Sequence, residues 1–221
     1  MKKVVISLGG SVIVPDKVDY KYLKKFKELI LKFSKKNKIV VVTGGGSTCR
    51  KYLKPLQRSK LDEKVYSLIG IASTKLNARL VASVFNITSR IPESLKEVRN
   101  DLKRRNVVVC GALGFHHERT SDATAAEIAK EIKADYFVNV TNVKGLYDNY
   151  ASKKAKLVKE ISFKDFLEII NKIKFKAGQH FVLDQKAAKM IKRSKIKTFI
   201  VDKSNLEKVL KGERYSGTLI R

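Results

Sequence analysis

Two clusters of glycine, each directly after an apolar run rich in β-branched residues, are the part of this sequence best suited to bind phosphate. The first occupies positions 9–10 and is followed by Ser11, and the second occupies positions 44–46. Glycine has no side chain, so backbone N–H groups can approach an anion closely at these positions. A helix that begins near Ser47 would turn its positive dipole end toward the same anion, and Arg50 lies one turn further on. The spacing predicts a phosphate-binding site built from both clusters.

Neither cluster matches the nucleotide-binding signatures that have a fixed spacing. The P-loop requires Gly-x-x-x-x-Gly-Lys-Ser/Thr and the dinucleotide-binding fold requires Gly-x-Gly-x-x-Gly, and neither pattern fits these positions. The sequence also lacks the glycine-rich loop, the strand lysine and the His-Arg-Asp motif of protein kinases. The glycines therefore indicate a phosphate-binding site of a different kind.

A third polar segment, residues 114–122, contains histidines, an arginine, two hydroxyls and a carboxylate. Thr120 or Ser121 is suited to cap the helix that follows. Arg119 is a candidate phosphate ligand. Alternatively, it is a solvated cation on a loop with no binding role. Asp122 either stabilises the helix dipole or orients a magnesium ion or a lysine. Adjacent side chains rarely chelate one ion, so the neighbouring histidines predict no metal site in the protein.

A fourth polar segment, residues 138–148, follows another apolar run. Thr141 and Asn142 stand where that run ends, and a turn at residues 144–145 comes next. Tyr147 could stack on a base because its ring offers a flat apolar face. This segment therefore suits a nucleoside, although a simple turn is the alternative.

The polar segments follow short apolar runs that we predict to be buried strands of a parallel sheet. The runs are residues 4–8, 39–43, 107–110, 136–140 and 198–201. Apolar residues recur at helical spacing between them, over residues 22–33, 61–85, 93–105, 122–133, 163–170 and 187–191. Alternation of strands and helices predicts an α/β fold, in which ligands bind at the carboxyl ends of the strands. We expect a single domain with a soft division between residues 120 and 134.

The composition is that of a globular protein, but the charge is strongly positive. Apolar residues make up 43 % and charged residues 31 %, and the formal net charge is +27. Clustered cations would indicate nucleic-acid binding, whereas scattered cations indicate a lysine-rich surface that attracts an anionic substrate. The lysines are scattered along the chain, and no RNA-binding or helix-turn-helix signature accompanies them. Nucleic acid is therefore the less favoured partner.

The location of the protein can be predicted from its apolar runs and its cysteines. No run approaches the ~18–20 residues that cross a bilayer, so we expect no membrane partner. The apolar stretch after Lys3 spans about five residues, below the ~7–15 of a signal peptide, and is interpreted as a first strand in a cytoplasmic protein. Cys49 and Cys110 match neither a zinc site nor a Cys-x-x-Cys motif, so we expect reduced structural thiols.

Taken together and in order, these motifs resemble the amino-acid kinase family, and within it the archaeal type of uridylate kinase. The resemblance runs over essentially the full length. It rests on residues 8–11, 44–46, 50, 70–71, 74, 77–78, 120–123, 134–135, 141–143, 145, 147, 177–178, 182, 184, 187–189, 196–198, 211–213 and 217–218. Any one of these motifs is unspecific, but the ordered set is strong, and residues 177–189 favour uridylate kinases over acetylglutamate, carbamate or isopentenyl phosphate kinases.

The resemblance implies a three-layer αβα sandwich with a mainly parallel central sheet. It implies one domain over residues 1–221, with an acceptor-binding lobe of about residues 1–120 and an ATP-binding lobe of about residues 121–221. The expected reaction converts UMP and ATP to UDP and ADP in pyrimidine nucleotide synthesis, with Mg²⁺ as cofactor and ATP as co-substrate. The family usually forms hexamers, so a homo-oligomer is expected.

The residues and the resemblance together imply a set of site residues. Asp122 and Arg50 are the expected catalytic residues. The ATP-binding residues are expected to be Gly9, Gly10, Ser11, Gly46, Arg50, Thr141, Asn142, Tyr147 and Tyr150. The UMP-binding residues are expected to be Gly45, Ser67, Thr74, Phe115, His116, His117, Glu118, Arg119, Thr120 and Ser121.

The chain also differs from the family pattern at several positions. Ser7 stands where many members have a lysine, and Ser67 stands where an aspartate holds the acceptor ribose. Residues 115–119 are bulkier than their counterparts, and Tyr150 replaces a frequent carboxylate. These differences leave two alternatives: a related kinase of another small phosphate or carboxylate, or a catalytically weakened relative that binds nucleic acid.

Overall fold

The structure is a computed structural model that describes residues 1–58, 62–114, 120–148, 155–172 and 183–221. Its strands are β1 (Lys3–Leu8), β2 (Lys38–Thr43), β3 (Val107–Cys110), β4 (Tyr136–Thr141), β5 (Glu160–Ile161), β6 (Thr198–Asp202) and β7 (Thr218–Ile220). Its helices are α1 (Gly10–Ile13), α2 (Tyr20–Ser34), α3 (Gly46–Leu53), α4 (Glu63–Val84), α5 (Leu95–Arg104), α6 (Ser121–Glu131), α7 (Phe163–Lys172), α8 (Gln185–Ser194) and α9 (Leu206–Lys211), with a 3₁₀ helix, η1, at Lys54–Arg58.

The strands form one sheet in the order β3-β2-β1-β4-β6-β7-β5. All neighbouring pairs are parallel except β6 and β7, which run antiparallel. In the centre, Val4 of β1 pairs with Ile39 on one side and Tyr136 on the other. The central strands are buried on both faces, which explains why they read as continuous apolar runs. The predicted mainly parallel sheet is confirmed.

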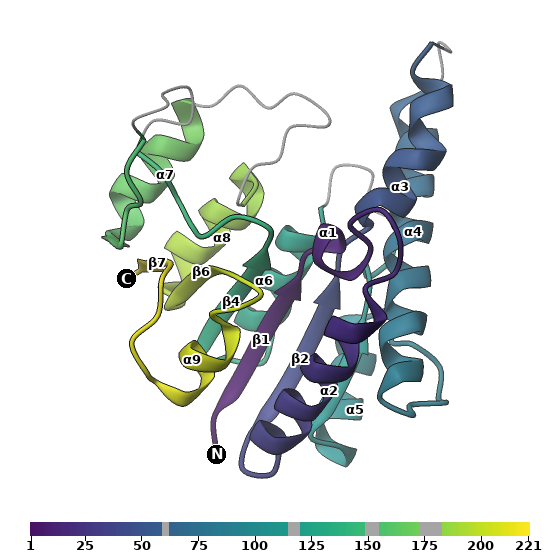
Figure 1. The fold of residues 1–221 in the computed structure, drawn as a ribbon, viewed down its shortest axis with the longest axis horizontal. Coiled ribbons are helices and arrows are strands. Elements are labelled where there is room, and N and C mark those ends of the chain that lie inside the picture. The colour runs from purple at the N-terminus through teal and green to yellow at the C-terminus, as the bar shows by residue number, and fades with distance from the viewer. Residues whose placement is uncertain (59–61, 115–119, 149–154, 173–182) are drawn as a thin grey trace.

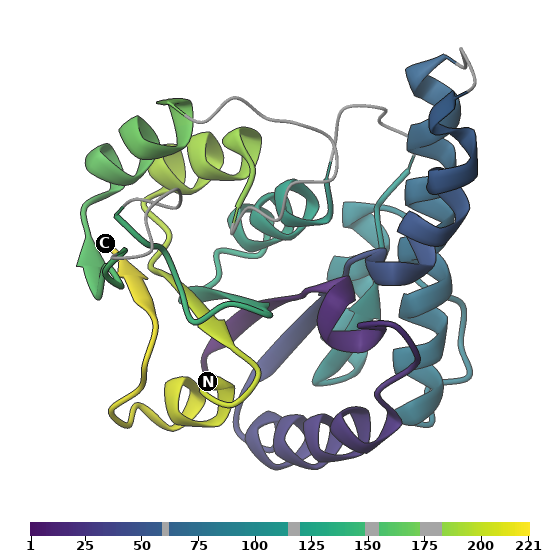
Figure 2. The ribbon, with the colours of Figure 1, turned by 45° about the horizontal axis from the view of Figure 1, so that its top comes forward.

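Helices cover both faces of this sheet, so the expected αβα sandwich is confirmed as well. Figure 2 shows α6, α7 and α8 on one side of the strands and α2 and α9 on the other. The long helix α4 stands along the β3 edge, and its upper half rises beyond the ends of the strands (Figure 1). One cluster of buried apolar residues extends through the fold from Val4 to Ile220.

Capping residues explain where the helices near the strand ends begin and stop. Thr120 accepts a hydrogen bond from the backbone N–H of Ala123 and so starts α6, which makes it the cap among the two predicted candidates, Thr120 and Ser121. The predicted extension of this helix to residue 133 is wrong, because Lys133 has a left-handed backbone with φ of 51°. Asp184 caps α8 through the N–H groups of Lys186 and Ala187.

The sequence did not predict β5 and β7. They contain two and three residues, too few to show an apolar period of their own. In the described part of the chain, no helix combines the length and the apolarity needed to cross a membrane.

Candidate active site

The two glycine turns touch each other at the carboxyl ends of β1 and β2. Gly44 donates its N–H to the carbonyl of Leu8 at 3.0 Å, and Gly9 donates to the carbonyl of Val140 at 2.8 Å. A Cβ atom on Gly10 would lie 2.0 Å from the backbone nitrogen of Gly46, which itself has φ of +63°. Only glycine permits so close an approach of two backbones. Both turns are therefore parts of one wall.

A cavity of about 210 Å³ opens at this wall. It brings together ten of the predicted site residues: Gly9, Gly10, Ser11, Gly45, Gly46, Arg50, Ser121, Asp122, Thr141 and Asn142. They come from the ends of β1, β2 and β4, from α1 and α3, and from the start of α6. Backbone N–H groups, hydroxyls and a guanidinium thus surround a space suited to phosphate oxygens.

Gly44 of the second glycine cluster and Val143 of the 141–143 motif also line this cavity, as does Asn139, for which the sequence predicted no role. Asn139 lies in β4 and is 3 % exposed. A buried amide costs free energy unless it is hydrogen-bonded, so an asparagine within the apolar run 136–140 was a signal that could have been used.

Asp122 lines the cavity, and Ser7 lies behind it as its hydrogen-bond partner. The buried hydroxyl of Ser7 donates to Oδ1 of Asp122 at 2.7 Å. Burial is the main reason that the pKa of Asp122 is raised to about 7; the charge of Asp184 adds to the rise, and the hydrogen bond from Ser7 opposes it. Carboxyl groups whose pKa is raised this strongly are common in active sites.

Thr120 and Asp184 connect α6 to α8 beside Asp122. The Thr120 hydroxyl donates a short hydrogen bond to Oδ2 of Asp184 while also capping α6. Asp184 caps α8 with its other oxygen. Two helix starts are thereby fixed relative to each other at the edge of the site.

A second cavity of about 180 Å³ adjoins the first. The two share Gly45 and Ser121 as lining residues. The second cavity also brings together Ser67, Thr74 and Thr120, which we had predicted for the acceptor. Its remaining lining residues are Cys49, Gly70, Ile71 and Ala112. Two substrates bound in these cavities would meet at Gly45 and Ser121.

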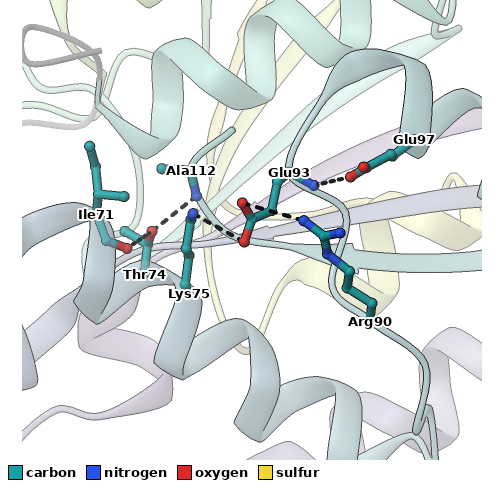
Figure 3. A network of polar contacts seen from close by, with 7 residues as sticks. All are labelled: Ile71, Thr74, Lys75, Arg90, Glu93, Glu97 and Ala112. Atoms are coloured by element: carbon teal, nitrogen blue, oxygen red, sulfur yellow. Dashed lines mark hydrogen bonds and ion pairs between the residues drawn. The ribbon is translucent and has the colours of Figure 1, made fainter. Parts of the chain in front are cut away.

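The hydroxyl of Thr74 forms two hydrogen bonds within the protein at the wall of this second cavity (Figure 3). It donates to the carbonyl of Ile71 at 2.8 Å and accepts from the N–H of Ala112 at 2.9 Å. Its only hydroxyl hydrogen is thus occupied, so Thr74 can offer a ligand a lone pair but no donor. The next residue, Lys75, forms an ion pair of 3.2 Å with Glu93, which ties α4 to the segment before α5.

The predicted residues Tyr150, Phe115, His116, His117, Glu118 and Arg119 lie outside the described residues, as do positions 177, 178 and 182 of the motif set. Tyr147 is described and forms an antiparallel bridge with Leu157. In the described ranges, no group of three or more His, Cys, Asp or Glu side chains is arranged to hold a metal ion.

Comparison with known proteins agrees with the fold. The family model of the amino acid kinase family matches residues 2–202. Uridylate kinases from Archaeoglobus fulgidus and Thermococcus kodakarensis are 38 % and 34 % identical to the chain, and each alignment covers 99 % of both proteins. The crystal structure of the Archaeoglobus fulgidus uridylate kinase superposes with a TM-score of 0.85 over 100 % of both chains. A UMP kinase structure from Bacillus anthracis, 19 % identical with a TM-score of 0.80, shares the fold.

Proposed function

The chain belongs to the amino acid kinase family, and from that premise we propose that it is an enzyme that transfers the γ-phosphoryl group of ATP to UMP, forming UDP and ADP. One observation carries this proposal: the glycine-lined cavity and the second cavity meet at Gly45 and Ser121. The first holds the phosphates of ATP, and the second holds the acceptor. Full-length uridylate kinase relatives support the choice of UMP.

Catalysis in this site is positioning and charge neutralisation. The acceptor phosphate is already an anion, so its oxygen attacks the γ-phosphorus in line without a general base. The N–H groups of Gly10 and Gly46 and the hydroxyl of Ser11 hold the transferring group from one side. Arg50 is exposed at the rim of the cavity and binds phosphate oxygens with two parallel hydrogen bonds.

The oxygen donors around the first cavity fit the magnesium ion that accompanies ATP. Mg²⁺ prefers carboxylate and phosphate oxygens and usually takes one or two ligands from the protein. Asp122 is the carboxylate that lines this cavity, and it would hold the ion together with the phosphates. The ion supplies positive charge that offsets the negative charge of the phosphates. Because Ser7 is neutral, the charge of a lysine at that position is replaced by Arg50 and the ion.

The nucleoside of UMP occupies the second cavity, among Ser67, Thr74 and Thr120. No described residue lining this cavity carries a charge, so hydrogen bonds and shape select the uncharged base. Thr141, Asn142 and Tyr147 hold the adenosine on the other side of the glycine wall. This division corresponds to an acceptor lobe of about residues 1–120 and an ATP lobe of about residues 121–221 in one domain.

Self-association is part of the proposal. Val65, Leu68 and Leu76 lie on one face of α4 and are 37 %, 51 % and 60 % exposed. An uncharged stripe on a chain of net charge +27 is the face on which a second copy meets least repulsion. The resemblance indicates a hexamer. ATP and UMP are charged metabolites of the cytoplasm, and pyrimidine nucleotide synthesis in that compartment is the process the enzyme serves.

A kinase of another small acceptor, which Ser67 in place of an aspartate suggested, is less favoured than a UMP kinase. The nucleic-acid-binding alternative is not favoured, since full-length relatives are uridylate kinases.

A coupled assay of ADP production with magnesium and ATP tests the proposal. UMP, CMP, isopentenyl phosphate and carbamate are compared as acceptors. We expect the highest kcat/KM with UMP and at least about 100-fold loss in Arg50→Ala, which removes a bidentate phosphate contact. Lys51→Ala, one position along in the same helix, is the matched control and should keep near-normal turnover. A higher kcat/KM for another acceptor would assign that acceptor instead.

A further inference from the structure

A third cavity, at the far end of the sheet, shares no lining residue with the two cavities of the active site. It has a volume of about 480 Å³, more than twice that of the glycine-lined cavity. Its walls include Lys159, Lys208, Arg214, Tyr215 and Ser216. Pockets that bind small molecules usually measure ~300–1,000 Å³, so a nucleotide-sized ligand fits.

Among the described residues, the acids near this cavity pair with cations other than the three that line it. Glu207 and Glu213 pair with Lys211, at 2.7 Å and 4.0 Å. Glu160 pairs with Arg221 at 2.6 Å. Within the described residues, Lys159, Lys208 and Arg214 form no ion pair of their own.

The walls of the cavity are fixed in advance. Gly212 ends α9 with a left-handed backbone, and Glu213 then donates its N–H to the carbonyl of Lys208 at 2.8 Å. Further along, Ser216 donates its N–H to the side chain of Asn205 at 2.9 Å. The ring of Tyr215 packs edge-on against Phe199 at 5.6 Å. The backbone that carries Lys208 and Arg214 on the walls of one cavity is therefore already in place before a ligand binds.

From these observations we propose that this cavity binds a small ligand carrying several phosphate groups. Three cations that have no acidic partner among the described residues attract a multiply charged anion more strongly than a single carboxylate. The hydroxyls of Ser216 and Tyr215 add neutral hydrogen-bonding groups beside them. The aromatic ring gives one wall to which a base or an apolar part of the ligand can pack.

The cavity also connects to the segment that carries Tyr147. Leu157 lines the cavity and forms the bridge with Tyr147. Next to the cavity wall, the hydroxyl of Thr218 accepts from the N–H of Leu146 at 2.8 Å and donates to the carbonyl of Val158 at 2.6 Å. A ligand that shifts this wall therefore shifts Tyr147. This second part rests on the proposed function, in which Tyr147 contacts ATP.

Inorganic tripolyphosphate is the probe, and isothermal titration calorimetry at physiological ionic strength is the measurement. We expect the unsubstituted protein to bind tripolyphosphate at two sites per chain, one in the glycine-lined cavity and one in the third cavity. Lys208→Ala/Arg214→Ala should weaken the second site by about tenfold or more, since each truncation removes a charge-assisted contact. Arg50→Ala should weaken only the first site.

Lys35→Ala/Lys36→Ala is the control, because it removes the same charge from an exposed position outside the cavity. It should keep both sites. The proposal is overturned if the unsubstituted protein binds tripolyphosphate at a single site and Arg50→Ala abolishes it. It is also overturned if the two double variants lose affinity at the second site equally.

Inhibition kinetics test the connection to Tyr147. Tripolyphosphate should inhibit the natural enzyme in a mixed manner against ATP, and Lys208→Ala/Arg214→Ala in a purely competitive manner with unchanged kcat. Purely competitive inhibition in both proteins would overturn the connection. Two-site binding without any UMP phosphorylation would support the cavity and overturn the kinase proposal, so the two failures are distinguishable.

Discussion

Ser7 donates a hydrogen bond to Asp122 at 2.7 Å, and this contact joins the carboxyl end of β1 to the first turn of α6. The serine is fully buried, so its hydroxyl is held in one orientation. The hydrogen bond favours the ionised carboxylate, while burial and the charge of Asp184 favour the protonated form. The protonation state of Asp122 therefore depends on a balance among these three influences.

The pH profile of kcat/KM tests this balance through Ser7→Ala. Removing the donor raises the pKa of Asp122 further, because one interaction that lowers it is lost. If the carboxylate is the active form, activity rises as pH increases through this pKa. The acidic limb of the profile should then move to higher pH, by about one unit for a hydrogen bond of ~1.5 kcal/mol.

Asp184→Asn is a control that should shift the pKa of Asp122 in the opposite direction. It removes a charge that raises the pKa of Asp122, so the same limb should move to lower pH. Asparagine also caps helices well, so α8 should persist. If the acidic limb of the pH profile does not move in either variant, the titration of Asp122 does not control the pH dependence of kcat/KM.

Asp122→Asn should lose activity and gain stability at alkaline pH. The pKa of Asp122 is about 7 in the folded protein, whereas an unperturbed aspartate has a pKa of 3.8. The folded state therefore holds this proton more tightly, and stability falls as pH rises from about 4 to about 7 and stays reduced above that. The neutral amide avoids this loss, so the gain in free energy of unfolding should reach about 1–3 kcal/mol above pH 8.

Denaturant unfolding at pH 5 and pH 8.5 measures this gain. Asp16→Asn is the control, because Asp16 is exposed and its partner Lys51 lowers its pKa. It should give no gain that grows across this range. A stability difference between Asp122→Asn and the natural protein that does not depend on pH would contradict the prediction.

Gly10→Ala tests the contact between the two glycine turns. The new Cβ would lie 2.0 Å from the Gly46 nitrogen, and backbone atoms cannot move aside as a flexible side chain can. We expect a loss of about 2–3 kcal/mol in free energy of unfolding and a loss of turnover.

Gly70→Ala is the matched control for this substitution. It lies within α4, and the nearest atom to the added Cβ is 3.9 Å away. Alanine favours a helix over glycine by about 0.5–1 kcal/mol, so this variant should be slightly more stable. Equal stability changes in Gly10→Ala and Gly70→Ala would mean that the turns have room to separate.

Cys49 reports on the second cavity through its reaction with N-ethylmaleimide. Burial raises the pKa of Cys49, and neighbouring Ser73 and Arg50 oppose the rise. Because the thiolate is the reactive form, labelling should speed up with increasing pH. Cys110 is fully buried with a pKa of about 12, so it should stay unlabelled in the folded protein.

UMP should slow the labelling of Cys49 more than ATP does, because Cys49 lines the cavity assigned to the acceptor. Peptide mass mapping identifies the modified thiol, and Cys49→Ser should remove the signal. Protection by ATP alone would reverse the assignment of the two cavities.

Much of the fold was predictable because its signals are local. The apolar runs that form β1, β2, β3, β4 and β6 were predicted to within one residue of their bounds. Thr120 and Ser121 were recognisable as candidate helix caps, and the two glycine clusters were recognisable as turns that follow buried strands. These features depend on neighbours a few residues away in the chain, where backbone preference and side-chain type act directly.

The sequence by itself determined which apolar runs are followed by glycines or by polar side chains. These residues indicated a ligand that carries phosphate. Only the tertiary structure decided which of these residues meet. Ser7 and Asp122 are 115 positions apart, and Asn139 reaches the cavity because β4 lies beside β1 in the sheet order. Strand order is set by packing of the whole core, which no local pattern encodes, so contacts between strand ends become visible only in the folded chain.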